Sequence, residues 1–249
     1  MNIKDIENFS KKIDGNIYFD YDLKKSNWFN IGGKSKIFFK PEKLEELISF
    51  LKIYKSRGKI FVIGAGSNIL ITDKLFDGVI IKLGRNFSKL SLLNDTTIIA
   101  GSSASDKKVS EFAKENNIGG FEFLSCIPGS IGGGIRMNTG CFDSEINDSL
   151  ISVQAANFDG QVFSILKKDI KFNYRECNLP KDLIFLSATL KGEKKEKNLI
   201  QKKIKKLKDK KETAQPTKIK TGGSTFKNPK AQTNKKVWEL IKSSVSLST

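Results

Sequence analysis

The sequence predicts a globular protein of mixed helices and strands, divided into two or three subdomains. Its 249 residues are enough for a large buried core, and 38% hydrophobic with 29% charged residues is the composition of an ordinary soluble chain. Apolar patterns with strand and helix periods alternate along most of the chain. A lysine-rich helical pattern followed by the polar stretch 213–220 then marks a subdomain boundary.

The N-terminal elements follow a strand–helix–strand order, which is typical of an α/β subdomain. An apolar run at residues 37–39 precedes Pro41, which opens a helix that ends at Gly58. The apolar face of this helix consists of Leu44, Leu47, Ile48, Leu51 and Tyr54. Strands are predicted at residues 60–63 and 79–83.

Capping signals and periodicity predict the elements of the middle of the chain. A strand at 98–101 precedes a helix with Ser105 as its N-cap and Asp106 in its first turn. The residues that this helix turns to the core are Val109, Phe112 and Ala113. Residues 152–157 and 161–165 have the pattern of a hairpin, residues 184–190 that of an apolar strand, and residues 237–241 begin an amphipathic helix.

The formal net charge of +17 would suit a nucleic-acid partner, but the kind and position of the basic residues argue against one. Only four of the 44 basic residues are arginine, whose forked side chain recognises phosphates and bases better than lysine. Eleven lysines fall within residues 191–211, where Ile200, Ile204 and Leu207 form an apolar stripe. We expect this segment to be a docked helix with a solvated basic face, and we expect no nucleic-acid partner.

The chain contains no histidine, which excludes Ser-His-Asp and Cys-His catalysis and removes nearly every transition-metal site. Cys126, Cys141 and Cys177 are far apart and have no metal-binding spacing, so they are expected to be structural thiols in a reducing cytoplasm. No signal-peptide pattern and no run long enough to cross a bilayer is visible. A cytoplasmic protein without a metal and without membrane insertion is therefore expected.

Two glycine-rich segments are candidates for a binding site. Residues 127–140, IPGSIGGGIRMNTG, hold five glycines among apolar residues, and such a density implies a close approach of the backbone to something else. The segment suits a flat, phosphate-bearing cofactor, and a tight structural turn is the alternative. Residues 64–70, GAGSNIL, offer N–H donors and two polar side chains for a pyrophosphate. Ile69 stands where a Rossmann motif needs its third glycine, and Trp28 stands where a P-loop ending at residues 32–35 needs its first.

Four segments stand in a characteristic order: NWFNIGG (27–33), GAGSNIL (64–70), IPGSIGGGIRMNTG (127–140) and GGSTFKNP (222–229), with FNYR (172–175) before the last. Together they closely resemble the UDP-N-acetylenolpyruvoylglucosamine reductase (UDP-N-acetylmuramate dehydrogenase) family. The resemblance implies the α+β class, with a two-subdomain FAD-binding fold of the vanillyl-alcohol-oxidase (PCMH) type. The implied subdomains are residues 1–84 and 85–212 for FAD and residues 213–249 for the substrate. The implied activity is NADPH-dependent reduction of a small-molecule UDP-sugar enolpyruvyl ether, with FAD as cofactor, in peptidoglycan precursor synthesis.

The resemblance also implies roles for particular residues. Arg175 would stabilise the negative charge that develops on the substrate, and Ser224 would donate the proton. Tyr174, Lys227 and Asn228 would bind substrate. The residues implied to hold the cofactor are Gly64, Ala65, Gly66, Ser67, Asn68, Ile69, Leu70, Pro128, Gly129, Ser130, Ile131, Gly132, Gly133, Asn138 and Gly140.

The sequence departs from the family pattern after the serine turn. The family continues well beyond it and supplies a catalytic glutamate near its end, whereas here the only acidic residue after Ser224 is Glu239, in a different motif. We therefore expect a C-terminally truncated reductase with an incomplete substrate subdomain. A non-catalytic remnant that at most binds FAD or nucleotide is the alternative. A monomer is expected.

Overall fold

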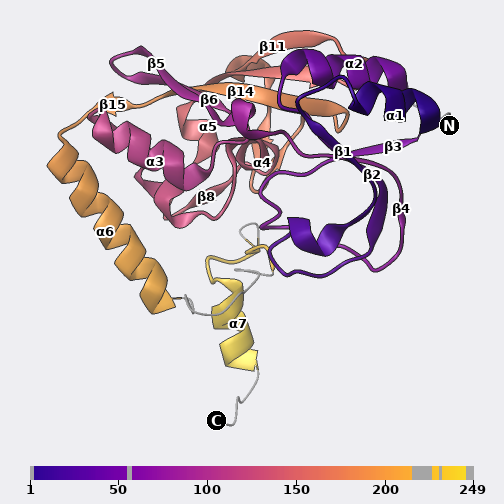
Figure 1. Ribbon diagram of the computed structural model, residues 1–249. Coiled ribbons are helices and arrows are strands. Elements are labelled where there is room, and N and C mark those ends of the chain that lie inside the picture. The colour runs from indigo at the N-terminus through magenta and orange to yellow at the C-terminus, as the bar shows by residue number, and fades with distance from the viewer. Residues whose placement is uncertain (1–2, 55–57, 215–225, 230–231, 245–249) are drawn as a thin grey trace.

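The computed structural model describes residues 3–54, 58–214, 226–229 and 232–244, and Figure 1 shows how its elements are arranged. The N-terminal part is a four-stranded sheet in the order β1–β2–β4–β3. β1 is antiparallel to β2, whereas β4 is parallel to both β2 and β3. The elements of this part are α1 (Ile3–Ser10), β1 (Asn16–Asp22), η1 (Leu23–Ser26), β2 (Lys34–Lys40), α2 (Leu44–Tyr54), β3 (Lys59–Val62) and β4 (Phe76–Ile81).

The central strand β2 is buried on both faces because its apolar residues alternate between two cores. Ile37 and Phe39 point to the side covered by α2, where Phe39 lies against Phe50 with ring centroids 4.3 Å apart. Phe38 points to the opposite side and packs with Leu23 and Ile80. This alternation is the period of a β-strand, and it explains the uninterrupted apolar run in the sequence.

The N-terminus of α2 is closed by a glutamate from its own first turn. Glu46 is buried, and its Oε2 accepts from the backbone N–H groups of Glu42 and Lys43, at 2.8 and 3.2 Å. Its Oε1 accepts from Asp14 N at 2.7 Å. The carboxylate thus satisfies the free N–H groups of the helix end and holds the turn before β1 against it.

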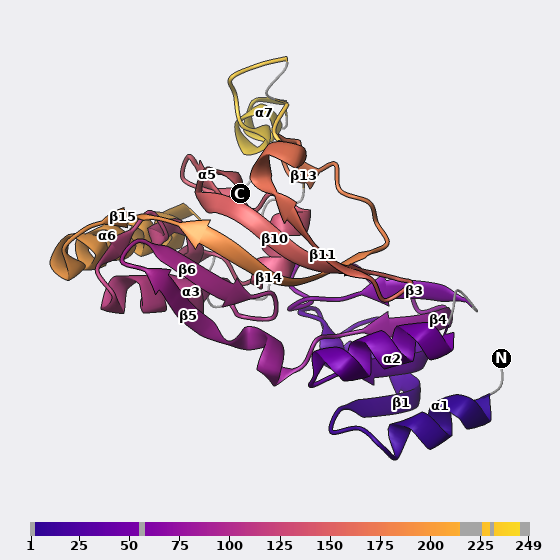
Figure 2. The same ribbon diagram turned by 90° about the horizontal axis from the view of Figure 1, so that it is seen from above.

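The second sheet has five antiparallel strands in the order β11–β10–β14–β6–β5, and Figure 2 shows it beside the N-terminal sheet. Its strands are β5 (Leu90–Asn94), β6 (Thr97–Gly101), β10 (Leu150–Asn157), β11 (Val162–Leu166) and β14 (Leu183–Lys191). The remaining short strands are β7 (Ile118–Gly119), β8 (Gly140–Cys141), β9 (Ser144–Glu145), β12 (Phe172–Asn173), β13 (Glu176–Cys177) and β15 (Glu193–Lys194).

Helices pack against this sheet and enclose the larger core, as Figure 1 shows. They are η2 (Arg85–Ser88), α3 (Asp106–Glu115), η3 (Glu122–Cys126), α4 (Ile131–Arg136), α5 (Ile146–Ser149), η4 (Lys167–Asp169) and α6 (Lys197–Ala214). The last helix, α7 (Val237–Ser244), has no buried residue and stands away from the sheet in Figure 1. The two sheets share packing, because Ala156, Ile184 and Leu186 of the second sheet belong to the same core as α2. The domain boundaries at 84 and 212 remain predictions. Within the described part of the chain, no helix is both long and apolar enough to cross a membrane.

Most of the predicted elements are confirmed. Ser105 caps α3 by accepting from Lys108 N at 3.3 Å, and the hairpin of β10 and β11 forms as expected. The lysine-rich helix docks through buried Ile200, Ile204 and Leu207. α1 and β1 were not predicted from the sequence. Their sequences are short and mix polar with apolar residues, and these elements are stabilised by tertiary contacts, since α1 shares a core with α2 and β1 pairs with β2.

Candidate functional site

The two glycine-rich segments lie against each other. A Cβ added to Gly64 would stand 2.6 Å from the hydroxyl oxygen of Ser130. Asn68 Nδ2 donates to Met137 Sδ at 3.3 Å, although the two residues are 69 positions apart in sequence. Glycine at position 64 therefore leaves room for the Ser130 hydroxyl, while the backbone N of Gly133 would lie 3.9 Å from the same Cβ, at ordinary contact distance. The structure brings residues 64–70 and 128–133 together as one surface.

Part of the segment 127–140 is a helix, whereas the sequence analysis predicted only a loop. α4 begins after Ser130, and its first two N–H groups donate to Ala104 O at 3.0 Å and Ser102 O at 2.8 Å. Ile131 and Ile135 are fully buried, which compensates for the low helix propensity of the three glycines between them. A Cβ at Gly132 would lie 3.1 Å from Ser102 Cβ, so a larger residue here would make a tight contact with residue 102.

Orphaned polar atoms border this surface. The hydroxyl oxygens of Ser102 and Ser130 are buried and have no hydrogen-bond partner among the residues that the structure describes. A Cβ at Gly133 would meet only the Ser130 hydroxyl, at 3.6 Å, so this part of the backbone is open. Buried hydroxyls normally have partners, and backbone cradles of this kind accept phosphate-bearing groups. These residues fit a dinucleotide such as FAD.

A third segment, residues 27–33, contacts residues 64–70, although no site residue was predicted in it. Trp28 N donates to Gly66 O at 2.9 Å, and Gly66 has a φ of 72° that favours glycine. The Asn27 amide donates to Leu23 O at 2.8 Å and to Ile31 O at 2.7 Å, which fixes the curve of residues 27–33. The NWFNIGG motif thus holds residues 64–70 in place. In the sequence, Asn27 and the paired glycines Gly32 and Gly33 were the features that could have indicated this supporting role.

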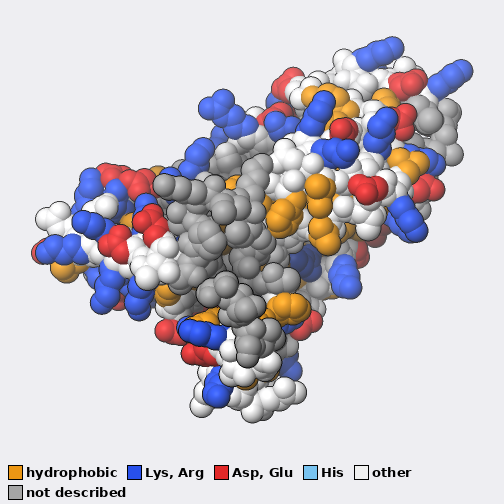
Figure 3. Space-filling view, turned by 90° about the horizontal axis from the view of Figure 1, so that it is seen from below, with side chains coloured by type: hydrophobic (Ala, Val, Ile, Leu, Met, Phe, Trp, Pro, Cys, Tyr) orange, Lys and Arg blue, Asp and Glu red, His pale blue; other side chains and the backbone are white. Residues whose placement is uncertain are grey.

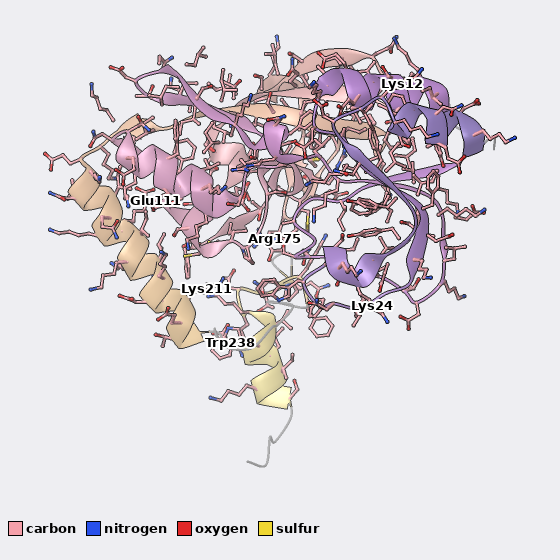
Figure 4. The ribbon with its side chains drawn as sticks, in the orientation of Figure 1. Lys12, Lys24, Glu111, Arg175, Lys211 and Trp238 are labelled. Carbon is pink, nitrogen blue, oxygen red and sulfur yellow. The ribbon has the colours of Figure 1, made fainter. Side chains whose placement is uncertain are left out.

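Arg175 reaches the far end of the glycine-rich segment (Figure 4). Its Nη2 donates to Gly140 O at 2.7 Å and its Nη1 to Asn138 O at 3.4 Å. It occupies the tip of the β12–β13 hairpin with a φ of 61°, a strained value for a residue with a side chain. Its guanidinium lies 5.2 Å from the Tyr174 ring centroid. Four of the predicted site residues therefore lie together: Asn138, Gly140, Tyr174 and Arg175.

Both polar atoms of the Asn138 side chain are hydrogen-bonded within the protein. It is 1% exposed, its Nδ2 donates to Asn173 O at 3.1 Å, and its Oδ1 accepts from Asn147 N at 3.3 Å. With a φ of 42°, it turns the chain sharply after α4. Its amide thus shapes the loop beside Arg175.

The predicted C-terminal residues are only partly described. Ser224 lies outside the described residues. Lys227 is exposed, and Asn228 Oδ1 accepts from Val237 N at 3.1 Å, so the asparagine caps α7 across nine residues. Figure 4 shows α7 below Arg175, with Trp238 on the helix.

Two buried ionisable groups adjoin the site. Burial raises the pKa of the Asp106 carboxyl to about 7, and neither of its oxygens has a partner among the described residues. A Cβ on Gly129 would collide with Asp106 Oδ2. Burial also raises the pKa of the Cys141 thiol to about 12, with Cys126 nearby as a further cause, so Cys141 is a thiol and a poor nucleophile. In the described ranges, no group of three or more Cys, Asp or Glu residues is arranged to hold a metal ion.

Comparisons with known proteins agree with this geometry. Residues 35–165 match the family described as "FAD binding domain". The chain is 58% identical over 247 residues to UDP-N-acetylenolpyruvoylglucosamine reductase of Pelagibacter ubique, covering 99% of the chain and 82% of that relative. It is 44% identical over 229 residues to the enzyme of the same name from Rickettsia prowazekii, covering 92% of the chain and 76% of the relative.

Solved structures show the same fold. UDP-N-acetylenolpyruvylglucosamine reductase from Thermus caldophilus matches with a TM-score of 0.78 at 26% identity, over 93% of this chain and 80% of that one. The 4-ethylphenol oxidase of Gulosibacter chungangensis matches with a TM-score of 0.56 at 14% identity, over 77% of this chain and 42% of that one. The predicted FAD-binding fold of the vanillyl-alcohol-oxidase type is confirmed by these matches.

Proposed function

The chain belongs to the UDP-N-acetylenolpyruvoylglucosamine reductase family, and on this premise we propose that it reduces UDP-N-acetylglucosamine enolpyruvate to UDP-N-acetylmuramate. This reaction of peptidoglycan precursor synthesis consumes one NADPH and one proton, and it converts a carbon–carbon double bond to a single bond. FAD, when bound, supplies the redox chemistry between NADPH and the substrate. Residues 64–70 and 128–133, with the Ser130 and Ser102 hydroxyls, are the groups that would hold it.

One observation supports the catalytic proposal more than any other: the Arg175 guanidinium is already held at the end of the glycine-rich segment. Its bonds to Gly140 O and Asn138 O occupy two of its five N–H donors, so donors remain for a substrate carboxylate. Addition of hydride to the terminal carbon of the double bond creates a further negative charge, which is delocalised onto that carboxylate until the second carbon receives its proton. A permanent cation held in advance stabilises this charge without reorganisation.

The other predicted residues complete the proposal. Ser224 would donate the proton to the second carbon of the double bond. Tyr174, whose ring lies beside the Arg175 guanidinium, would border the substrate, and Lys227 and Asn228 would contact its polar groups. The Asn228 bond to α7 supports an indirect contribution as well, because it positions the helix next to the KNP turn.

The first test is anaerobic absorbance of the FAD-loaded protein, with NADPH added first and the enolpyruvyl UDP-sugar second. We expect the flavin absorbance to fall with NADPH and to recover with substrate. Arg175→Met should leave the first step within about two-fold and slow the recovery by about 10²–10³, the usual loss for one oxyanion stabiliser. Arg85→Met, at an exposed arginine of η2, is the matched control and should behave as wild type.

Each other outcome has a definite meaning. Loss of absorbance without recovery in the wild type would overturn the reductase proposal and leave a chain that accepts hydride from NADPH but does not pass it to the UDP-sugar. Retained FAD whose absorbance does not fall with NADPH would leave the alternative of a non-catalytic chain that only binds FAD. Failure to retain FAD would overturn the reductase proposal and the assignment of residues 64–70 and 128–133 to the cofactor. Equal recovery in wild type and Arg175→Met would remove Arg175 from the catalytic proposal.

We also propose a cytoplasmic monomer without a nucleic-acid partner. The three cysteines are free, and Cys126 and Cys177 are buried, as is usual in a reducing compartment. Light scattering during size-exclusion chromatography measures the mass directly, and a value near twice 27.8 kDa would contradict the monomer.

A further inference from the structure

Arg136, at the C-terminal end of α4, makes an unusual number of contacts with one segment. Its Nη1 donates to Leu179 O and to Pro180 O, both at 2.9 Å, and its Nη2 donates to Leu183 O at 3.1 Å. Its guanidinium lies over the Phe185 ring, 4.6 Å from the centroid. The carbonyl groups of Leu179 and Pro180 belong to the connection between β13 and β14, and that of Leu183 belongs to the first residue of β14. A single side chain therefore closes this connection onto the glycine-rich segment.

The connection directly follows the hairpin that carries Arg175. β12 and β13 have two residues each and pair only with one another in the described part of the chain, so no larger sheet fixes them. Lys171 N donates to Asn178 Oδ1 at 2.8 Å and Asn178 N to Lys171 O at 3.0 Å, which closes the base of the hairpin. The base is therefore a compact unit whose position depends on its ties to neighbouring elements.

The polar ties come from one short stretch of chain, while Phe172, Cys177 and Leu179 add apolar packing against the larger core. Asn138 Nδ2 holds one arm of the hairpin through Asn173 O at 3.1 Å, and Arg136 holds the residues that leave the other arm. Arg136 is the last residue of α4 and Asn138 follows it before β8, so both lie next to the backbone that the tip residue Arg175 contacts. The hairpin is thus fixed at its base by Arg136 and near its tip by Asn138.

We infer that Arg136 is a positioning residue, which fixes the β12–β13 hairpin on the glycine-rich segment and so places the Arg175 guanidinium. The catalytic part of this inference rests on the proposed function of Arg175. Arginine is needed because its planar fork reaches three carbonyl oxygens while its face covers Phe185. A lysine keeps the charge but presents a point charge without the fork or the flat face. Displacement of a catalytic group by about 1 Å can slow a reaction about 10²-fold.

The experiment compares wild type, Arg136→Lys, Arg136→Met and the control Arg85→Met, all loaded with FAD. Hydrogen exchange of peptides covering residues 172–180 reports how often the hairpin and the residues after it open, and steady-state kinetics report the consequence for turnover. We expect exchange in these peptides to rise about ten-fold or more in Arg136→Met and to remain raised in Arg136→Lys. We expect kcat to fall by about 10–10² in both variants, with KM for NADPH and FAD retention within about two-fold.

Exchange equal to wild type in residues 172–180 would overturn the inference, as would full restoration by Arg136→Lys, because charge alone would then suffice. An equal rise of exchange throughout the protein would also overturn it and assign Arg136 to general stability. If Arg136→Met fails to fold, Arg136→Lys decides by the same readouts. A wild type without turnover would refute the proposed function, while the exchange comparison would still decide whether Arg136 holds the hairpin.

Discussion

At the scale of single residues, the most unusual feature is the buried carboxyl of Asp106. It is 0% exposed, and neither of its oxygens has a partner among the described residues. The carboxyl lies under the glycine-rich segment, where Asp106 N donates to Gly129 O at 3.2 Å. A charge in such a place is poorly solvated, and this burial raises the pKa of the carboxyl to about 7.

This raised pKa predicts how stability changes with pH. In the unfolded chain the Asp106 carboxyl releases its proton at about pH 3.9. In the folded chain it keeps the proton until about pH 7. Between these values the folded state binds more protons than the unfolded state, so the free energy of unfolding falls as the pH rises. Three pKa units correspond to about 4 kcal/mol. Asp106→Asn should lack this fall.

Urea unfolding from about pH 4 to about pH 8 measures the difference. Asp159→Asn, at an exposed position in the β10–β11 turn, is the matched control and should follow the wild-type curve. Parallel curves for wild type and Asp106→Asn would show that the carboxyl has the same pKa in the folded and the unfolded chain, and would contradict the prediction.

At the scale of elements, the cofactor surface depends on the fit between two segments. Gly64→Ala would place a methyl group 2.6 Å from the Ser130 hydroxyl and displace this hydroxyl from its position beside residues 64–70. Because the displaced hydroxyl belongs to the surface that would hold FAD, FAD affinity should fall by about ten-fold. Ser130→Ala should weaken FAD binding less, by loss of one hydroxyl partner.

The double variant Gly64→Ala, Ser130→Ala provides the internal control. Because the colliding hydroxyl is gone, it should bind FAD more tightly than Gly64→Ala alone, and titration of FAD fluorescence measures all four proteins. Strictly additive losses would mean that the two segments do not meet in the protein.

The same scale shows how far the sequence could predict this site. Patterning predicted the strand before residues 64–70 and the cap of α3, because both follow from local rules. It could not predict α4, since three consecutive glycines disfavour a helix and only the burial of Ile131 and Ile135 compensates. The contacts of Arg136 were also out of reach. Its partners are backbone carbonyls, and these have no signature in the sequence.

At the scale of the whole molecule, two sheets share one apolar core while the surface carries a large excess of positive charge. Lys and Arg side chains are spread over the face seen in Figure 3. On α6, Lys203 pairs with buried Glu122 at 3.4 Å and Lys197 pairs with Glu115. Three further lysines of α6 have no acidic partner within the described part of the chain: Lys202, Lys205 and Lys206. Repulsion among such charges opposes the compact state.

We therefore expect added salt to stabilise this protein. At a formal net charge of +17, screening should reduce repulsion more than it weakens the exposed ion pairs, which contribute little. The midpoint of thermal unfolding should rise between about 0.02 and about 0.3 M NaCl, by about 2–4 °C for each kcal/mol gained. Lys206→Glu exchanges one positive for one negative charge and lowers the formal charge from +17 to +15, so its midpoint should depend less on salt. A midpoint that falls as the salt concentration rises would contradict this prediction. It would show that attractive ion pairs, such as those of α6 with Glu115 and Glu122, outweigh the repulsion between positive charges.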